Sequence, residues 1–156
     1  MISPEVLRRF PVFVGFNDAQ LKALAMIADE RELEANKLIF EEGASAKKLY
    51  LLVNGSIDLY MKSEEEYDPT SRRDFSVGEI NPGELFGISS LLDPPKYSVA
   101  AISAQASTLI EFDANALRAL AQEDNYFAYN MMHQIMKSLI QRLKSTRVQL
   151  AAAWAT

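Results

Sequence analysis

The spacing of apolar residues changes twice along the chain. Residues 17–30 place apolar side chains three and four residues apart, which predicts an amphipathic helix with Asn17 or Asp18 as its N-cap. A shorter helix is predicted over residues 3–10, where Ser3 is a suitable cap and Pro4 takes the first helical position. Beyond residue 37 the helical spacing gives way to short apolar runs, which indicates a change to strands.

The central part of the chain has the pattern of an antiparallel β-sandwich or barrel. Short runs rich in Val, Ile, Leu, Tyr and Phe are separated by Gly, Pro or Asn about every 8–12 residues. The runs are KLIFEEG, KKLYLLVNGSIDLYM, DFSVGEINPGELFG, YSVAAIS and STLIEFD. Within the second run, Asn54-Gly55 predicts a tight hairpin turn between two apolar strands. The polar stretch 62–74 predicts a long, mobile hairpin loop.

The C-terminal part is helical again. A helix capped by Asp113 is predicted over DANALRALAQED, followed by one long helix from Asp124 to about Leu150. The apolar stripe of the long helix contains Phe127, Met131, Ile135, Leu139, Leu143 and Leu150 and is widened by Met132, Met136 and Ile140. A stripe this broad predicts contact with the barrel on one side and with a partner helix on the other. We therefore expect a homodimer through this helix; the alternative is that the whole stripe packs within its own chain.

Length and composition indicate one domain with an appended helix: a domain over residues 1–124 and a dimerisation or lid helix over residues 125–156. The net charge of −5 is uneven, because residues 125–156 carry four basic residues and no acidic one. Four cations along one helix are simplest to interpret as solvated charge, and we expect no direct DNA binding. The chain has no apolar run long enough for a membrane span and no signal-peptide pattern, so we expect a cytoplasmic protein.

The residue types argue against an enzyme. The chain has no cysteine, which removes disulfides, thiol catalysis and zinc–thiolate sites together. His133 is the only histidine and falls on the long helix, so neither a multi-histidine metal site in the barrel nor a Ser-His-Asp triad can be assembled convincingly. No Gly-x-Ser-x-Gly sequence occurs. We expect no catalytic activity, no bound metal and no cofactor.

The segment PGELFGISSLLDPPKYSVAA, residues 82–101, is the candidate binding segment. Gly83 permits a sharp turn, and a following short helix would offer unpaired amides around Phe86 to Ile88 to an anion. Gly87 lets a ligand approach the backbone closely. Glu84 adds an acceptor suited to a sugar hydroxyl, and the combination suggests a nucleotide. The alternative is an ordinary Pro-Gly turn followed by a helical connector.

With these segments the chain resembles the cyclic nucleotide-binding domain family, which includes the catabolite activator protein and the regulatory subunits of the cAMP-dependent kinase. The resemblance covers nearly the whole chain and is carried by FNDAQLKALA, KLIFEEG, LYLLVNGSIDLY, INPGELFGISSLL and YSVAAISAQASTLIEFD. It implies a mostly β fold with flanking helices: an eight-stranded jelly-roll barrel, or double-stranded β-helix, with N-terminal helices and a long C-terminal helix. Many members continue into a helix-turn-helix domain, whereas this chain stops soon after the long helix.

The resemblance also implies a phosphate-binding cassette. In it, Glu84 would bind the ribose 2′-hydroxyl, and amides near Phe86 and Gly87 would hold the cyclic phosphate. The family's clamp arginine is missing, because Tyr97 occupies its position. On the long helix, Thr146 matches a position that can bond an adenine amino group. The candidate ligand-binding residues are Gly83, Glu84, Leu85, Phe86, Gly87, Lys96, Tyr97, Ser98, Thr146 and Arg147.

The missing arginine leaves two hypotheses. Losing one charge-assisted bond would weaken phosphate binding by about ten- to a hundredfold. Lys96 cannot easily replace it, because neighbouring side chains of an extended segment point to opposite faces. The first hypothesis is a regulatory module that binds a cyclic nucleotide, with cAMP favoured over cGMP, and signals through the C-terminal helix. The second is a degenerate cassette, plugged by Tyr97 or Phe86, in a protein-interaction or dimerisation scaffold.

Overall fold

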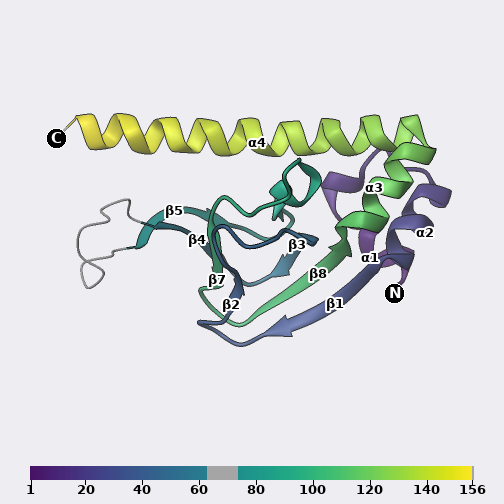
Figure 1. Ribbon diagram of the computed structural model, residues 1–156, viewed down its shortest axis with the longest axis horizontal. Coiled ribbons are helices and arrows are strands. Elements are labelled where there is room, and N and C mark those ends of the chain that lie inside the picture. The colour runs from purple at the N-terminus through teal and green to yellow at the C-terminus, as the bar shows by residue number, and fades with distance from the viewer. Residues whose placement is uncertain (63–73, 156) are drawn as a thin grey trace.

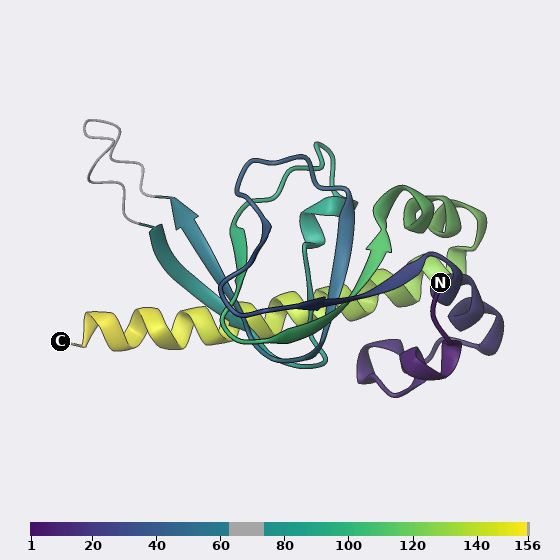
Figure 2. The same ribbon diagram turned by 90° about the horizontal axis from the view of Figure 1, so that it is seen from below.

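The computed structural model describes residues 1–62 and 74–155, which form two sheets, a group of helices at one end and one long helix along the side (Figures 1 and 2). The strands are β1 (Ala28–Leu33), β2 (Leu38–Phe40), β3 (Lys48–Asn54), β4 (Ile57–Lys62), β5 (Asp74–Ile80), β6 (Leu85–Phe86), β7 (Ala100–Ser103) and β8 (Ser107–Asp113). The helices are α1 (Pro4–Arg8), α2 (Asp18–Met26), α3 (Ala114–Glu123) and α4 (Asn125–Trp154), with 3₁₀ turns η1 (Pro11–Phe13) and η2 (Ile88–Leu91). The mostly β fold with flanking helices is thus confirmed.

The two sheets are antiparallel and have four strands each, in the orders β1-β8-β3-β6 and β2-β7-β4-β5. They share one apolar core, to which Phe40, Leu52, Ile57, Ile80 and Leu109 contribute. Between the named strands of the described residues, no pairing joins one sheet to the other. The structure therefore shows two facing sheets, and the closed jelly-roll barrel stays a prediction.

The turn at Gly55 is present, but the predicted hairpin is wrong. Strand β3 pairs with β6 and β8, whereas β4 pairs with β5 and β7, so the turn carries the chain from one sheet to the other. Gly55 has φ of +103°, and a Cβ at this position would lie 2.2 Å from Ser107 Oγ and 2.7 Å from the Ala106 carbonyl oxygen. The chain crosses directly against the β7–β8 connection, and only glycine leaves room for that approach.

The predicted helix over residues 17–30 is only partly correct. Its Asn17 cap is confirmed, with a capping box to Gln20, but α2 ends at Met26. Residues 28–33 instead form β1, which pairs along its whole length with β8. Glu, Arg and Leu favour helices locally, so in this segment the long-range ladder with β8 overrides local propensity.

The other predicted helices are confirmed. Ser3 caps α1, Asp113 caps α3, and the Asp124 carboxylate accepts hydrogen bonds from the first amides of α4. Residues 63–73 of the predicted loop lie outside the described residues; β4 and β5 pair with each other on either side of it. None of the helices that the structure describes combines the length and apolar character of a membrane span.

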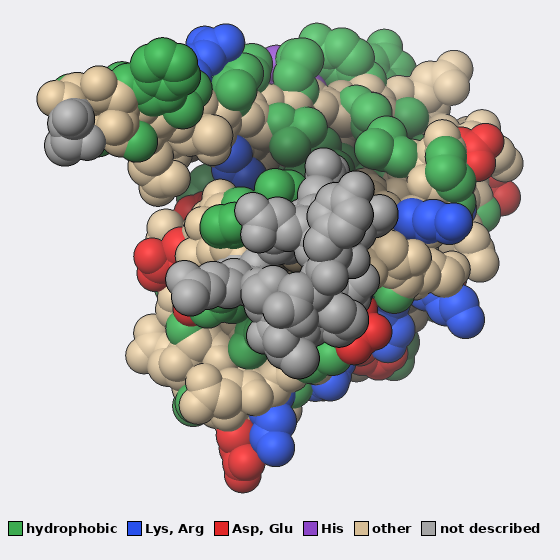
Figure 3. Space-filling view, turned by 60° about the vertical axis from the view of Figure 1, so that its left-hand side comes forward, with side chains coloured by type: hydrophobic (Ala, Val, Ile, Leu, Met, Phe, Trp, Pro, Cys, Tyr) green, Lys and Arg blue, Asp and Glu red, His purple; other side chains and the backbone are tan. Residues whose placement is uncertain are grey.

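Helix α4 has two apolar stripes rather than one broad one. Phe127, Met131 and Ile135 are 2–4% exposed and pack into a second apolar cluster, between the other helices and the β1-β8-β3-β6 sheet, as expected for the side that faces the body. A second stripe, which we call the outer stripe, lies exposed along the helix (Figure 3). It consists of Tyr129, Met132, Met136, Leu139, Leu143 and Leu150, each 46–68% exposed. Its spacing alternates between three and four residues up to Leu143 and then takes one seven-residue step, which is typical of the a and d positions of a coiled coil.

We predict that Gly55→Ala destabilises the protein much more than Gly43→Ala. Both glycines have positive φ, but a Cβ on Gly43 would meet nothing within 4 Å. Backbone strain alone should lower the free energy of unfolding by about 1–2 kcal/mol at Gly43. At Gly55 the overlap with the β7–β8 backbone adds to the strain, so we expect a loss of about 3 kcal/mol or more. Urea unfolding at one protein concentration measures the free energy of unfolding of both variants. Equal losses would mean that the close approach at Gly55 contributes nothing to stability.

Candidate functional site

The predicted binding segment lies on strand β3. The Gly83 amide donates to the Leu52 carbonyl at 2.7 Å, and the Leu52 amide donates to the Glu84 carbonyl at 3.1 Å. Leu85 and Phe86 then pair with β3 as strand β6, so the predicted short helix begins later than expected, at Ile88. Because Phe86 is held in a ladder, the segment is a strand and a 3₁₀ turn joined at Gly87, which has φ of +73°.

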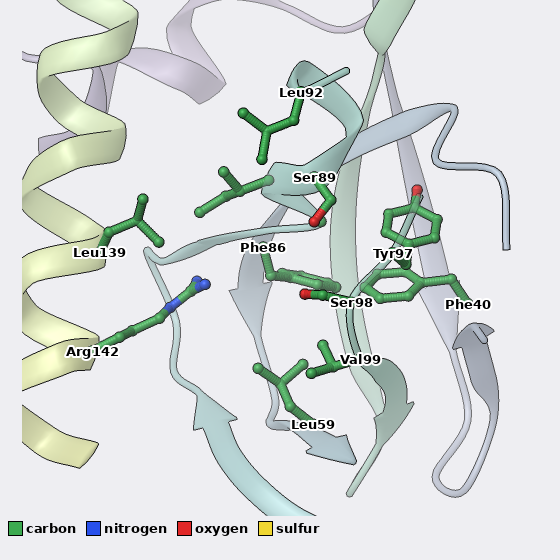
Figure 4. Close-up of a pocket in the computed structure, with 12 residues that line it drawn as sticks. Phe40, Leu59, Phe86, Ser89, Leu92, Tyr97, Ser98, Val99, Leu139 and Arg142 are labelled. Carbon is green, nitrogen blue, oxygen red and sulfur yellow. The ribbon is translucent and has the colours of Figure 1, made fainter. Parts of the chain in front are cut away.

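A pocket of about 260 Å³ opens between this segment and α4 (Figure 4). The apolar residues that line it are Phe40, Leu59, Phe86, Ile88, Leu92, Val99 and Leu139. The other lining residues are Gly87, Ser89, Tyr97, Ser98 and Arg142. Among these residues Arg142 alone is charged, so an anion in the pocket would depend on it. The volume is close to the lower end of the range usual for small-molecule sites, about 300–1,000 Å³.

The structure brings only some of the predicted site residues to this pocket. Phe86, Gly87, Tyr97 and Ser98 line it. The candidates outside its lining are Gly83, Glu84, Leu85, Lys96, Thr146 and Arg147. Of these, Lys96, Thr146 and Arg147 are exposed. The Thr146 hydroxyl donates to the Arg142 carbonyl one helical turn earlier, at 2.9 Å.

Tyr97, at the position of the family's arginine, points into the protein. Its ring stacks on Phe40 with centroids 3.7 Å apart and an angle of 13° between the planes. Its hydroxyl donates to the Lys48 carbonyl at 2.8 Å and accepts from the Lys48 amide at 3.3 Å, and it points away from Arg142 (Figure 4). Burial raises the pKa of the Tyr97 hydroxyl. Lys96 is exposed, as the alternation along an extended segment requires. Neither side chain offers a charge to the pocket.

Gly87 is enclosed by the protein's own aromatic residues. A Cβ at this position would lie 3.0 Å from the Tyr50 ring and 3.1 Å from the Lys48 carbonyl oxygen. Tyr50 stacks on Phe86 at 5.1 Å, and burial is the main reason that its hydroxyl pKa is far above the usual value. The close approach that glycine permits here is therefore made by Tyr50, on the side of Gly87 that faces the sheet interior.

An ion triplet holds the strand that anchors Tyr97. Glu111 is 7% exposed and accepts from Lys48 Nζ at 2.6 Å and from Arg31 at 2.9 Å. Two cations on one buried carboxylate satisfy its charge and fix the start of β3. The Lys48 backbone, which binds the Tyr97 hydroxyl, is thereby held in place.

Arg142 is the site residue that the sequence prediction missed. Its guanidinium reaches from α4 into the pocket and donates to the Leu85 carbonyl (Figure 4). Its Nε is buried and has no hydrogen-bond partner among the described residues. Burial lowers the pKa of Arg142, and the nearby Glu84 carboxylate opposes this shift. A signal was present: Arg142 follows Ile135 by seven residues, on the stripe that faces the body.

A second arginine holds the other end of the binding segment. Arg118, on α3, donates to the Ser90 carbonyl and to the Leu92 carbonyl, the latter at 3.2 Å. Ser90 is fully buried, and its hydroxyl has no partner among the described residues. The turn η2 is thus tied to α3 while β6 is tied to α4, so the binding segment bridges the two C-terminal helices.

Comparison with known proteins finds relatives over most of the chain. The chain is 22% identical over 147 residues to the CRP-like cAMP-activated global transcriptional regulator of Mycobacterium tuberculosis, a match that covers 94% of this chain and 61% of the regulator. It is 25% identical over 129 residues to the cyclic AMP receptor protein of Thermus thermophilus, covering 83% of this chain and 57% of that protein. The chain thus spans about 60% of the length of these curated relatives.

Solved structures and a family model give the same result. A Geobacter metallireducens protein classed as cyclic nucleotide-binding superimposes with a TM-score of 0.78 and 28% identity, covering 92% of this chain and 99% of the other. The family model for the cyclic nucleotide-binding domain matches residues 30–124, from β1 to the cap of α4. That range is more than half of the chain and contains the whole binding segment. The chain belongs to the cyclic nucleotide-binding domain family.

Proposed function

We propose that this chain is a non-enzymatic regulatory module that binds a cyclic nucleotide, with cAMP favoured, and responds through α4. One observation carries the proposal: the Arg142 guanidinium lies in the wall of an otherwise uncharged pocket beside the family's binding segment. A partly buried cation whose Nε is buried and has no partner among the described residues is an incomplete site, and a phosphate oxygen is a suitable partner for it. Family membership supports a cyclic nucleotide as the source of that phosphate.

The proposed ligand is held from three sides. The first amides of η2 and the Ser98 hydroxyl bind the cyclic phosphate. Glu84, which lies outside the lining of the pocket but near Arg142, accepts from a ribose 2′-hydroxyl that projects beyond the lining. Arg142 replaces the missing cassette arginine with a planar, two-pronged donor, which a lysine does not provide. Its charge-assisted bond is worth about 1.5–3 kcal/mol, comparable to the contact that Tyr97 withholds.

The proposed response follows from where Arg142 is attached. In the structure its guanidinium binds the Leu85 carbonyl and so ties α4 to strand β6. A phosphate that binds the Arg142 guanidinium in place of the Leu85 carbonyl removes this hydrogen bond between α4 and the binding segment. It therefore favours a different position of α4. The ligand acts by population shift, to the extent that it binds one helix position better than the other.

We predict that titration calorimetry with cAMP detects binding that depends on Arg142. Arg142→Ala should weaken it by about ten- to a hundredfold, and Arg142→Lys by less, because the charge remains while the fork is lost. Glu84→Ala should also lower the affinity through loss of the ribose contact. Lys144→Ala is the matched control, since it removes one exposed charge from the same helix. Absence of both heat and thermal shift at millimolar cAMP and cGMP would contradict the proposed function.

A second candidate is the degenerate cassette in an interaction scaffold. It is favoured by Tyr97, whose buried ring takes the arginine position while its hydroxyl is bonded to the Lys48 backbone and not turned toward Arg142. In this case the Leu85 carbonyl is the permanent partner of Arg142, and the pocket binds no nucleotide. The same titration with cAMP separates the two candidates. If the chain is a scaffold, it should bind no cAMP and should still associate through α4.

We further propose a homodimer formed by the outer stripe. Six apolar side chains exposed at a and d positions are a ready coiled-coil seam, and a second copy of α4 offers an identical one. The stripe lies about a third of a turn around the helix from Phe127, Met131 and Ile135, which face the body, so a partner helix can reach it without disturbing the core. A parallel pair brings the two bodies to opposite sides of the seam.

We predict that Leu143→Glu abolishes the dimer and that Val148→Glu does not. Leu143 lies between Leu139 and Leu150 in the seam, where a carboxylate would be buried opposite its own copy. Val148 is 69% exposed and lies off the outer stripe, so the same change there should leave association nearly intact. Sedimentation velocity over a range of concentrations measures both variants. A wild-type chain that remains monomeric at tens of micromolar would refute the seam.

A further inference from the structure

The turn η2 forms one wall of the pocket, yet its own hydrogen bonds support it weakly. Ile88 and Ser89 of the turn and Leu92, which follows it, line the pocket (Figure 4). Within the turn, the Ser90 amide donates to the Gly87 carbonyl at 3.1 Å. The Leu92 amide donates to the Ser89 carbonyl at 3.1 Å. A single 3₁₀ turn has poor hydrogen-bond geometry and no cooperative support from further turns, so contacts with the rest of the protein must set its position.

The apolar packing between η2 and the helices is incomplete. A cleft of about 100 Å³ lies between η2, α3 and the first half of α4. Leu91 of the turn, Leu117 of α3 and Met131 of α4 are among the residues that line it. Atoms that face an open cleft lack some of the van der Waals contacts that a filled core provides. Packing alone therefore holds η2 less firmly than it holds the strands.

The Ser90 side chain opposes the position that η2 takes. Ser90 and Ser103 are both 0% exposed, but only the Ser103 hydroxyl is paired. It donates to the Glu34 carbonyl at 2.6 Å and accepts from the Lys37 amide at 2.9 Å. The Ser90 hydroxyl has no partner among the described residues. Burial of an unpaired hydroxyl is unfavourable, so another contact must keep η2 in place.

Arg118 supplies that contact from α3. Its Nη2 donates to the Ser90 carbonyl and, at 3.2 Å, to the Leu92 carbonyl. Another nitrogen of the guanidinium donates to the Asn115 side chain at 3.4 Å, one turn earlier on α3, which fixes the direction of the group. In the part of the chain that the structure describes, Arg118 pairs with no carboxylate, and no other side chain bonds the backbone of η2. The charge of Arg118 thus acts on η2 alone.

We propose that Arg118 is a positioning residue of the binding pocket. It holds η2, and with it the side chains of Ile88, Ser89 and Leu92, where a ligand meets them. Arg118 lies outside the lining of the pocket, so it acts through the turn and not by contact with the ligand. The effect on ligand binding rests on the proposed function, whereas the hold of Arg118 on η2 is a property of the ligand-free protein.

Hydrogen exchange measures this hold without ligand. Arg118→Met keeps most of the aliphatic side chain and removes the donors. The Ser90 and Leu92 amides of this variant should exchange within about tenfold of the rate of an unstructured peptide, and about ten- to a hundredfold faster than in the wild type. Amides of β8 should stay at least about a thousandfold slower than in the peptide, because the body remains folded. Ser90 and Leu92 amides that stay as protected as in the wild type overturn the proposal.

Calorimetry with cAMP measures the effect on binding. Arg118→Met should weaken binding by about tenfold, because the ligand then binds only the minor fraction of molecules in which the turn is in place. Arg118→Lys should recover part of this loss, since it restores the charge but not the planar fork. Arg9→Ala is the matched control, because it removes an exposed arginine next to α1, and it should change neither the affinity nor the exchange of η2.

Two serine variants test the opposing contribution of Ser90. Ser90→Ala removes an unpaired hydroxyl and should raise the midpoint of urea unfolding, whereas Ser103→Ala removes a paired one and should lower it. A lower midpoint in both variants would mean that the Ser90 hydroxyl is paired, for example by a buried water, and would count against the dependence of η2 on Arg118.

The outcomes separate this inference from the proposed function. If the wild type binds cAMP and Arg118→Met binds it equally well, Arg118 is no positioning residue and the proposed function stands. If the wild type binds no cAMP, the proposed function is refuted and the role of Arg118 in cAMP binding falls with it. The exchange measurement then still decides whether Arg118 holds η2.

Discussion

The bond between the Arg142 guanidinium and the Leu85 carbonyl is the contact on which the arrangement of the pocket depends. It joins the long helix to the shortest strand, and it does so with a buried charge whose pKa is lowered by that burial. A partly buried cation needs a polar partner, so near Arg142 the helix stays against β6 while that carbonyl, or a stronger acceptor, is available. The start of the helix is held separately by Phe127, Met131 and Ile135, which pack in the core. Arg118 makes the same kind of bond at the other end of the segment. The binding segment is thus held between α3 and α4 by hydrogen bonds to its backbone carbonyl oxygens.

Local signals were sufficient for the helix ends and insufficient for the strand partners. Ser3, Asn17 and Asp113 were predicted as caps because a cap depends on a side chain and the amides two or three residues away. At Gly55 the turn was correctly located, but the apolar runs on either side of it are equally compatible with one sheet or two. Only pairing partners tens of residues away decide that choice. Strand β1 was missed for the same reason, since its charged sequence gains its conformation from β8.

The features of the candidate site also differ in how far the sequence predicts them. The opposite orientations of Lys96 and Tyr97 follow from backbone alternation and can therefore be predicted from the sequence alone. The depth to which Tyr97 is buried could not be predicted, because it depends on Phe40 and on the Lys48 backbone, which come from distant segments. Arg142 is difficult to identify from the sequence, because a charged residue on a helix is normally expected to face solvent. Its place on the stripe that faces the body was the one local indication.

Leu139 belongs to two surfaces at once: it lines the pocket, and it is part of the exposed seam of α4. A contact in the pocket that fixes the Leu139 side chain also restricts its conformation in the seam, and a contact in the seam restricts it in the pocket. The proposed sensor would therefore have two inputs, the amount of ligand and the amount of the protein itself. A cell could tune its response by changing expression alone, without altering a residue of the pocket, and a dilute sample in vitro would report a different sensitivity from a crowded one in vivo.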